Sequence, residues 1–302
     1  MIGKHIKQIN NLVITKSNEV YFVWSPYKEL LYRDYQLRNC ELYCSKNTLY
    51  LKVTNSQRTL EQVKNLRPTV IEQSEINKAR QLINQGTILI YHGTKKPNLT
   101  PNFNYVNTDN DYGKGFYTTS DKELGKEWAY AQYTPGTQGY LYTYQIDLSK
   151  LNVLNLTEYD SLLWVAELLA HRNINTDGRE ALQDTISDFI AKYKIDTSQF
   201  DVIIGYRADD SYFTYASDFV SGNIYKATLE NALRYGDLGL QVFIKSQKAF
   251  DMLKSVGTAE LVDKKYESYY KKRDVSARDK YKITRDSYNK SVRVKQRITD
   301  FL

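Results

Sequence analysis

The sequence predicts an α+β protein with three parts: a small N-terminal α+β unit at 1–85, a larger α+β domain at 86–256 and a basic helical tail at 257–302. Short apolar runs rich in β-branched and aromatic residues alternate with longer segments of helical periodicity. After Gly86 the connections between strand-like runs become longer, which marks the second part. From Leu261 onward 13 Lys and Arg stand against 6 Asp and Glu, whereas the other 29 basic and 29 acidic residues cancel. The positive excess therefore lies in the tail.

The composition excludes several classes of protein. Charged residues make up 25% and hydrophobic residues 41% of the chain, as in ordinary soluble domains. No run of apolar residues is long enough to span a bilayer, and the first residues do not resemble a signal peptide. We therefore expect a cytoplasmic protein without membrane contact. The two cysteines, Cys40 and Cys44, and three scattered histidines give no four-ligand zinc spacing, so we expect no metal and reduced thiols.

The N-terminal unit reads as a mixture of hairpins and helices. The predicted strands are 12–15, 20–24, 41–44 and 48–53, and the predicted helices are 25–37, 56–66 and 74–84. Ser25 and Pro26 suit the N-cap and first position of the helix at 25–37. No catalytic constellation occurs here. Regulation, target binding and partner binding all remain open as its role.

The second part carries five predicted strands and three predicted helices. The strands are 87–91, 115–118, 139–147, 202–205 and 239–244, and the helices are 122–132, 159–173 and 180–193. Alternation at Tyr140, Tyr142 and Tyr144 favours a half-buried strand. The tail that follows is helix-prone but weakly amphipathic. It either packs as an extension of the domain or stays mobile until a partner binds.

The stretch from Leu89 to Gln132 has the residues that a nicotinamide dinucleotide site requires. An apolar strand ends in His92 and Gly93, where an imidazole can bind a ribose hydroxyl and bare backbone can approach an amide. A tight Gly-Lys-Gly turn follows, and Tyr117 and Trp128 offer two flat aromatic faces. Splitting the nicotinamide–ribose bond requires a ring held flat and a ribose held in place. We interpret this stretch as the wall of a dinucleotide groove.

These motifs resemble a known family. Tyr91-His92-Gly93-Thr94, then Asp111-Tyr112-Gly113-Lys114-Gly115-Phe116-Tyr117, then Trp128 resemble the histidine-tyrosine-glutamate class of ADP-ribosyltransferases, which includes diphtheria toxin and the poly(ADP-ribose) polymerases. A closer resemblance is to the bacterial domain-of-unknown-function family 3990, through the blocks 164–172, 201–210 and 240–250. The similarity covers about 87–253. It implies an ADP-ribosyltransferase-like split β-sheet core with helices.

The resemblance also implies roles for single residues. His92 would bond the adenosine-side ribose, Gly93 would meet the nicotinamide amide through its backbone, and Tyr117 and Trp128 would enclose the nicotinamide ring. Thr94 completes this group of cofactor-binding residues. Charge and context alone make Lys114 and Arg172 candidates for the pyrophosphate. For Arg172 the alternative is an exposed helix end.

The third motif departs from the family pattern. The class commonly places a glutamate on a late strand, and the matching residue here is Gln241. An amide holds a hydroxyl but supplies no charge, and losing one preorganised electrostatic group costs about a hundred- to a thousand-fold in rate. Asp209 and Asp210 follow an apolar strand and could supply the carboxylate, or could instead form a turn or helix cap. The catalytic candidates are therefore Gln241, Asp209, Asp210 and Tyr117. Glu167, on a predicted helix, is most simply a solvated residue.

The resulting hypothesis is a mono-ADP-ribosyltransferase that uses NAD as substrate and modifies an intracellular protein or nucleic acid. The resemblance implies a bacterial toxin, toxin–antitoxin component or phage-defence effector, with an antitoxin as partner if the chain is the toxin of a pair. Hydrolysis of NAD is a further outcome at such a site. Two alternatives stay open: a catalytically weak or inactive module that binds NAD or ADP-ribose, and a nucleic-acid-binding protein that acts through its basic tail.

Overall fold

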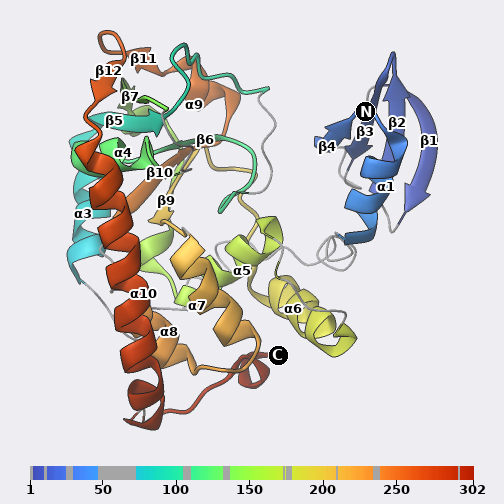
Figure 1. Ribbon diagram of the computed structural model, residues 1–302, viewed down its shortest axis with the longest axis vertical. Helices are drawn as coiled ribbons and strands as arrows, with labels where there is room; N and C mark the ends of the chain where they lie inside the picture. Colours follow the sequence, from blue (N-terminus) through green and yellow to red (C-terminus); the bar gives the residue numbers. More distant parts are fainter. Residues whose placement is uncertain are drawn as a thin grey trace.

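The computed structural model describes residues 3–9, 12–24, 30–46, 73–104, 110–131, 137–172, 174, 179–208, 210–233, 239–291 and 293–302. These residues form a mixed α+β structure with several sheets, as the sequence predicts (Figure 1). The bounds of β7 (Gly139–Asp147) and α6 (Glu180–Tyr193) are those predicted. Among the described residues, no helix combines the length and the apolar character that crossing a bilayer requires.

In the described part of the N-terminal unit, helix α1 (Leu37–Lys46) covers an antiparallel sheet. Its strands, in spatial order, are β1 (Lys4–Ile9), β2 (Leu12–Ser17), β3 (Val20–Trp24) and β4 (Leu30–Asp34). Helix α1 packs Cys40 and Cys44 against Leu12 and Ile14, and both thiols are free. Burial raises the pKa of each thiol to about 11, so neither is a reactive thiolate at neutral pH.

Two sequence predictions in this unit are wrong. The region predicted as a helix over 25–37 contains strand β4, because Tyr32 and its neighbours complete the sheet beside β3. The region predicted as a strand over 41–44 lies within α1, where Leu37, Cys40 and Cys44 follow helical spacing and share the buried side. The predicted strand at 48–53 and the predicted helix at 56–66 lie outside the described residues.

The second part contains two sheets that meet at one point. The strands are β5 (Thr87–Thr94), β6 (Phe116–Thr118), β7, β8 (Val153–Asn155), β9 (Val202–Tyr206), β10 (Leu240–Ile244), β11 (Lys254–Ser255) and β12 (Glu260–Val262). One sheet has the order β6-β10-β9-β8, and the other joins β5, β11 and β12 to β7. A single bridge, Tyr91 to Thr119, connects β5 to the chain that continues β6.

Helices cover both sides of these sheets. They are α3 (Gln73–Gln85), α4 (Lys122–Trp128), α5 (Ser161–His171), α6, α7 (Asp210–Val220), α8 (Lys226–Ala232) and α9 (Gln247–Asp251). Helix α3 packs on the face that carries Phe116, Val242 and Ile244. Helices α5 to α8 pack on the opposite face, which carries Phe243 and Tyr117. The described residues also include the short 3₁₀ segments η3 (Leu148–Lys150), η4 (Leu156–Glu158) and η5 (Ile298–Phe301).

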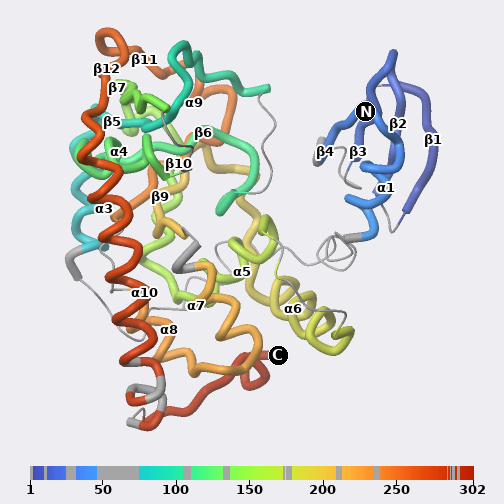
Figure 2. Tube along the Cα trace, in the orientation of Figure 1, coloured from blue at the N-terminus to red at the C-terminus, as the bar shows by residue number. Residues whose placement is uncertain are grey.

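The basic tail is packed along most of its length. Helix α10 (Lys265–Ser291) runs past α4, α7 and α8 (Figure 1). Arg273 binds both carboxylate oxygens of buried Glu127 on α4, at 2.7 Å each, and Tyr281 donates to Asp218 on α7 at 2.6 Å. The chain then returns to α6, where Tyr193 donates to the Phe301 carbonyl (Figure 2). Of the two alternatives for the tail, the structure therefore has the packed one.

Candidate functional site

The candidate site begins where β5 and β6 separate. The backbone N–H and C=O of Tyr91 both bond to Thr119, at 2.8 and 3.0 Å. Backbone N–H and C=O groups point to alternate sides of a strand, so those of Gly93, two residues after Tyr91, also point toward β6. The carbonyl of Tyr117, which would face Gly93, instead lies 2.7 Å from His92 Nδ1. Among the described residues no backbone bond joins Gly93 to β6, so the two strands part at this glycine.

His92 is held in one protonation state and one tautomer. Burial lowers its pKa to about 4, so the ring is neutral at physiological pH. Since a carbonyl only accepts, Nδ1 carries the proton and Nε2 keeps its lone pair. The ring packs on Phe116, 4.6 Å between centroids, and therefore lies on the sheet face opposite Tyr117. The free lone pair can accept a bond from a ligand hydroxyl.

Helix α4 approaches β5 so closely that position 93 requires a glycine. A Cβ at this position would overlap the Gly125 carbonyl oxygen and lie 2.5 Å from the Ala129 nitrogen. Both are backbone atoms, so no side-chain rotation relieves the overlap. Helix α4 therefore rests directly on the strand, and its last residue, Trp128, is brought beside the opening between β5 and β6.

We predict that Gly93→Ala costs about 1–3 kcal/mol of stability through overpacking, because α4 must move away from β5. Urea unfolding followed by circular dichroism would measure this loss. Thr94→Ala, one residue along the same strand, is the control and should change stability by about 0.5 kcal/mol or less. An unfolding midpoint for Gly93→Ala equal to that of the unmodified protein would contradict this packing argument.

Tyr117 is fixed by the loop that precedes it. Its hydroxyl donates to the Gly113 carbonyl at 2.6 Å and accepts from the Tyr112 N–H at 3.0 Å. Burial raises its pKa well above the ordinary value, so the hydroxyl stays neutral. Its ring packs against Phe243 with centroids 4.7 Å apart. Tyr117 therefore offers a ligand its ring and not its hydroxyl.

A buried carboxylate, Asp111, lies beside Gln241. Cross-strand pairing places Gln241 and Tyr117 on the same face, and the Gln241 amide donates to Asp111 Oδ2 at 3.0 Å. The Ala208 N–H donates to the same oxygen at 2.8 Å, and Arg172 contacts Oδ1 at 3.3 Å. Burial raises the pKa of Asp111 to about 6, against the opposing charge of Arg172. Gln241 Oε1 is buried, and no described residue forms a hydrogen bond with it.

Sequence reasoning missed the role of Asp111. It occurs in the quoted motif Asp111-Tyr112-Gly113, but it is separated from Gln241 by 130 residues of sequence. The available signal was an acidic residue directly before a glycine turn that leads into a strand. The expected alternatives, Asp209 and Asp210, are not tested: Asp209 lies outside the described residues, and of Asp210 only the backbone, at the start of α7, is described.

The remaining candidates have separate environments. Arg172 caps the end of α5, bonds the Ala208 carbonyl at 2.9 Å and packs on Phe213, so it is not simply an exposed helix end. Lys114 lies 5.1 Å from the centre of the Phe103 ring. The Thr94 hydroxyl faces the Lys96 N–H at 3.4 Å. The contacts of Arg172 place it beside Asp111. We define the Asp111 cluster as Asp111, Arg172, Arg207 and Gln241 together with Tyr117 and Trp128.

The expectation that Glu167 is solvated is wrong. Its side chain is 2% exposed and contacts His171 at 3.2 Å and Lys194 at 3.5 Å. The charge of Lys194 and the bond from His171 outweigh desolvation and lower the pKa of Glu167 to about 2. The His171 ring in turn fills the space beside Gly113, which has a φ of +79°. Glu167 thus supports the loop that carries Asp111.

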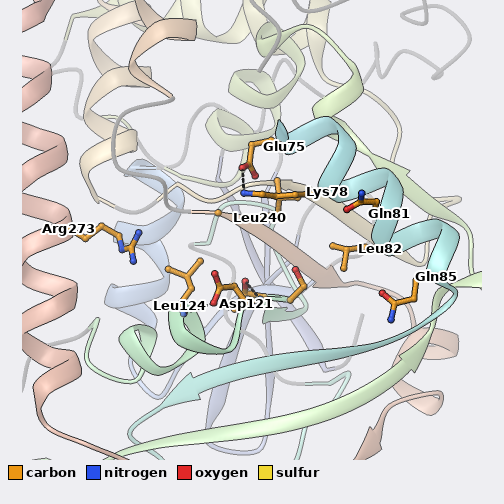
Figure 3. A pocket seen from close by; sticks show the side chains of 12 residues that line it. Glu75, Lys78, Gln81, Leu82, Gln85, Asp121, Leu124, Leu240 and Arg273 are labelled. Carbon is orange, nitrogen blue, oxygen red and sulfur yellow. Dashed lines mark hydrogen bonds and ion pairs between the residues drawn. The ribbon is translucent and has the colours of Figure 1, made fainter. Parts of the chain in front are cut away.

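A cavity of about 290 Å³ lies beside the first residues of β10 (Figure 3). It is lined by α3 residues including Glu75 and Lys78, by Asp121 and Leu124, and by Arg273 from α10. Residues of the Asp111 cluster are not part of its lining. The Asp111 cluster is the candidate functional site, because it combines a perturbed carboxylate with buried polar atoms that have no hydrogen-bond partner in the described part of the chain.

Comparison with known proteins gave one match. No curated protein and no solved structure matched the chain. A family model described as "Protein of unknown function (DUF3990)" matched residues 88–255, which contain β5 from its second residue, β6 to β11 and all residues of the Asp111 cluster. The chain therefore belongs to this family.

Proposed function

We propose that the protein is an NAD-dependent ADP-ribosyltransferase that transfers one ADP-ribose to an intracellular macromolecule. The observation that carries the proposal is the carboxylate of Asp111, held against Gln241 at the place where the sequence lacks the expected glutamate. A carboxylate offers about four acceptor positions, of which Arg172, Ala208 and Gln241 take three. Among the described residues, these contacts leave one acceptor position for a ligand.

In this proposal the open backbone of Gly93 binds the nicotinamide amide, and the ring of Tyr117 lies against the nicotinamide ring. The neutral His92 accepts a ribose hydroxyl at Nε2, and Gln241 Oε1 accepts a second one. The bond between ribose C1′ and the nicotinamide nitrogen breaks, and nicotinamide leaves with the electron pair. Negative charge at Asp111 stabilises the positive charge that develops on the ribose. A nucleophile of the acceptor, or water, then bonds to C1′ and releases a proton.

His92 lies on the other face of the sheet from Tyr117 and Gln241. The proposal therefore requires NAD to lie in the opening between β5 and β6, where a ligand reaches both faces. The parting of the strands at Gly93 supports this placement. The role as a toxin, toxin–antitoxin component or phage-defence effector rests on the family resemblance, as does an antitoxin partner.

The test is incubation of the full chain with NAD labelled in the adenine ring, in the presence of total protein, RNA and DNA. We expect label in one macromolecular fraction and free nicotinamide, both reduced at least tenfold in His92→Ala. His5→Ala, at an exposed histidine of β1, is the matched control. Binding of NAD without nicotinamide release would instead identify a binding module. Absence of both label and nicotinamide release would rule out the transferase.

A further inference from the structure

Arg207 is a buried arginine, and one nitrogen of its guanidinium has no hydrogen-bond partner among the residues that the structure describes. It follows β9 directly and is 9% exposed. Its guanidinium lies 4.5 Å from the Trp128 ring and 6.0 Å from the ring of Tyr270 on α10. Nη1 is buried, and no acceptor bonds to it among the residues that the structure describes. Burying a charged donor is costly unless an acceptor compensates it.

Trp128 has a second unused donor at the same contact. Its indole Nε1 is buried and has no hydrogen-bond partner among the residues described. The guanidinium of Arg207 covers one face of the indole. Two donors, one of them charged, therefore meet where α4 approaches the end of β9.

The carboxylates near this contact are already compensated. Asp111 accepts from Arg172, Gln241 and the Ala208 N–H. Glu127, beside Trp128 on α4, accepts two bonds from Arg273. The charge of Asp111 also acts on Arg207, so the guanidinium groups of Arg172 and Arg207 together face one carboxylate. This excess of positive charge favours a negatively charged ligand.

We propose that Arg207 and Trp128 form an anion subsite that binds a phosphoryl group. A phosphoryl group presents several acceptor oxygens and so matches both the guanidinium fork and the indole N–H. Gly205 pairs with Gln241, and Arg207 follows two residues later, directly after the end of β9. Two extended residues span about 7 Å, so the backbone of Arg207 lies about that far beyond the residue that pairs with Gln241, which leaves room for a ribose between the two.

This inference deepens the proposed function and rests on it only for the identity of the ligand as NAD. It assigns the phosphate to Arg207 and leaves Arg172 with Asp111. It also gives Trp128 a hydrogen-bonding role, since one face of its ring is already covered by Arg207. A nicotinamide ring can then stack only on the other face.

The test measures calorimetric affinity of the full chain for ADP-ribose, nicotinamide mononucleotide and inorganic pyrophosphate. Arg207→Gln should weaken binding of each by about tenfold to a hundredfold, the contribution of one charge-assisted hydrogen bond. Arg207→Lys keeps the positive charge and should lose less affinity than Arg207→Gln. Trp128→Phe keeps a ring for Arg207 to pack on and should lose about tenfold or less. Arg293→Gln, at an exposed arginine, is the control. Thermal unfolding of each variant checks the fold.

Unchanged affinity in Arg207→Gln overturns the subsite, and so does an Arg207→Lys variant as weak as Arg207→Gln. Absence of binding of all three probes to the unmodified chain overturns it as well. The proposed function fails separately. Arg207-dependent binding of ADP-ribose without nicotinamide release from NAD would leave the anion subsite in place and remove the transferase. Nicotinamide release from NAD with an unchanged KM for NAD in Arg207→Gln would support the transferase and remove the anion subsite.

Discussion

Asp111→Asn should lower nicotinamide release from NAD about a hundred- to a thousand-fold, with little change in KM. The substitution keeps the shape of the side chain and removes the charge that faces the ribose. Burial raises the pKa of Asp111 to about 6 in the folded state. The folded protein therefore loses stability as pH rises from about 4 to 6, because the buried carboxyl group must ionise. Asparagine avoids that cost, so we expect the variant to remain folded. Initial rates at saturating NAD would measure the effect.

The pH dependence of the rate distinguishes a reacting carboxylate from a supporting one. The charged and titratable groups around the Asp111 loop are Arg172, Arg207, Glu167, His171, Tyr112 and Tyr117. Asp111 loses its proton as pH rises through about 6, so the rate should rise about tenfold per pH unit below that value and level off above it. Asp111→Asn should lose this rise, whereas the control His171→Gln should keep it.

An exchange of the two side chains is the sharpest control. Asp111→Asn combined with Gln241→Glu swaps carboxylate and amide across the same 3.0 Å hydrogen bond. We expect the double variant to recover at least tenfold over Asp111→Asn. Gln241→Glu alone places two carboxylates together, where one of them takes up a proton, so it should not exceed the unmodified rate. Asp111→Asn with an unchanged rate and pH profile would show that this carboxylate is structural.

Lys226→Met should cost about 3–5 kcal/mol of stability, the largest loss that we expect from a substitution outside the site. Lys226 begins α8 and is 5% exposed. It binds Asp160 at 2.7 Å and Glu230 at 2.9 Å, and both carboxylates are buried. Asp160 also caps α5, the helix that ends at Arg172. Without the ammonium, two buried carboxylates lose their shared counter-charge.

Denaturant unfolding would measure this loss, with Lys290→Met at an exposed position of α10 as the control. The control should change stability by about 0.5 kcal/mol or less. A loss below about 1 kcal/mol for Lys226→Met would show that α5 and α8 do not depend on this ion pair. Nicotinamide release measured below the unfolding midpoint should fall only modestly, because the partners of Lys226, Asp160 and Glu230, are outside the Asp111 cluster.

The sequence predicted the elements whose periodicity agrees with their packing. Strand β7 alternates as the pattern indicates, and α5 is apolar on every side because it is buried on every side. Prediction failed at β4 and α1, where pairing with β3 and a shared buried face outweighed local propensity. Glu167 was misjudged because Lys194, which neutralises it, lies on a different segment after α6.

The sequence predicted only those residues of the candidate site that belong to local motifs. His92, Gly93, Tyr117 and Trp128 belong to short patterns that sequence alone displays. Asp111 and Arg207 acquire their roles only from contacts with Gln241 and Trp128 on distant segments. Such contacts depend on the order of strands in the sheet, which no periodicity specifies.

Helix α10 lies outside the segment that matches the family model, yet it packs on residues inside that segment. The part of the chain that folds together is therefore longer than the matched part. The family match ends at residue 255, yet Glu127 and Tyr215 within it bond to Arg273 and Ala277 beyond it. A fragment trimmed to the matched residues would leave the Glu127 carboxylate unpaired and uncover the side of α7 that carries Tyr215. The residues that stabilise α4, and with it Trp128, therefore lie partly in a segment that the family model does not include, so comparisons within the family need the complete chain.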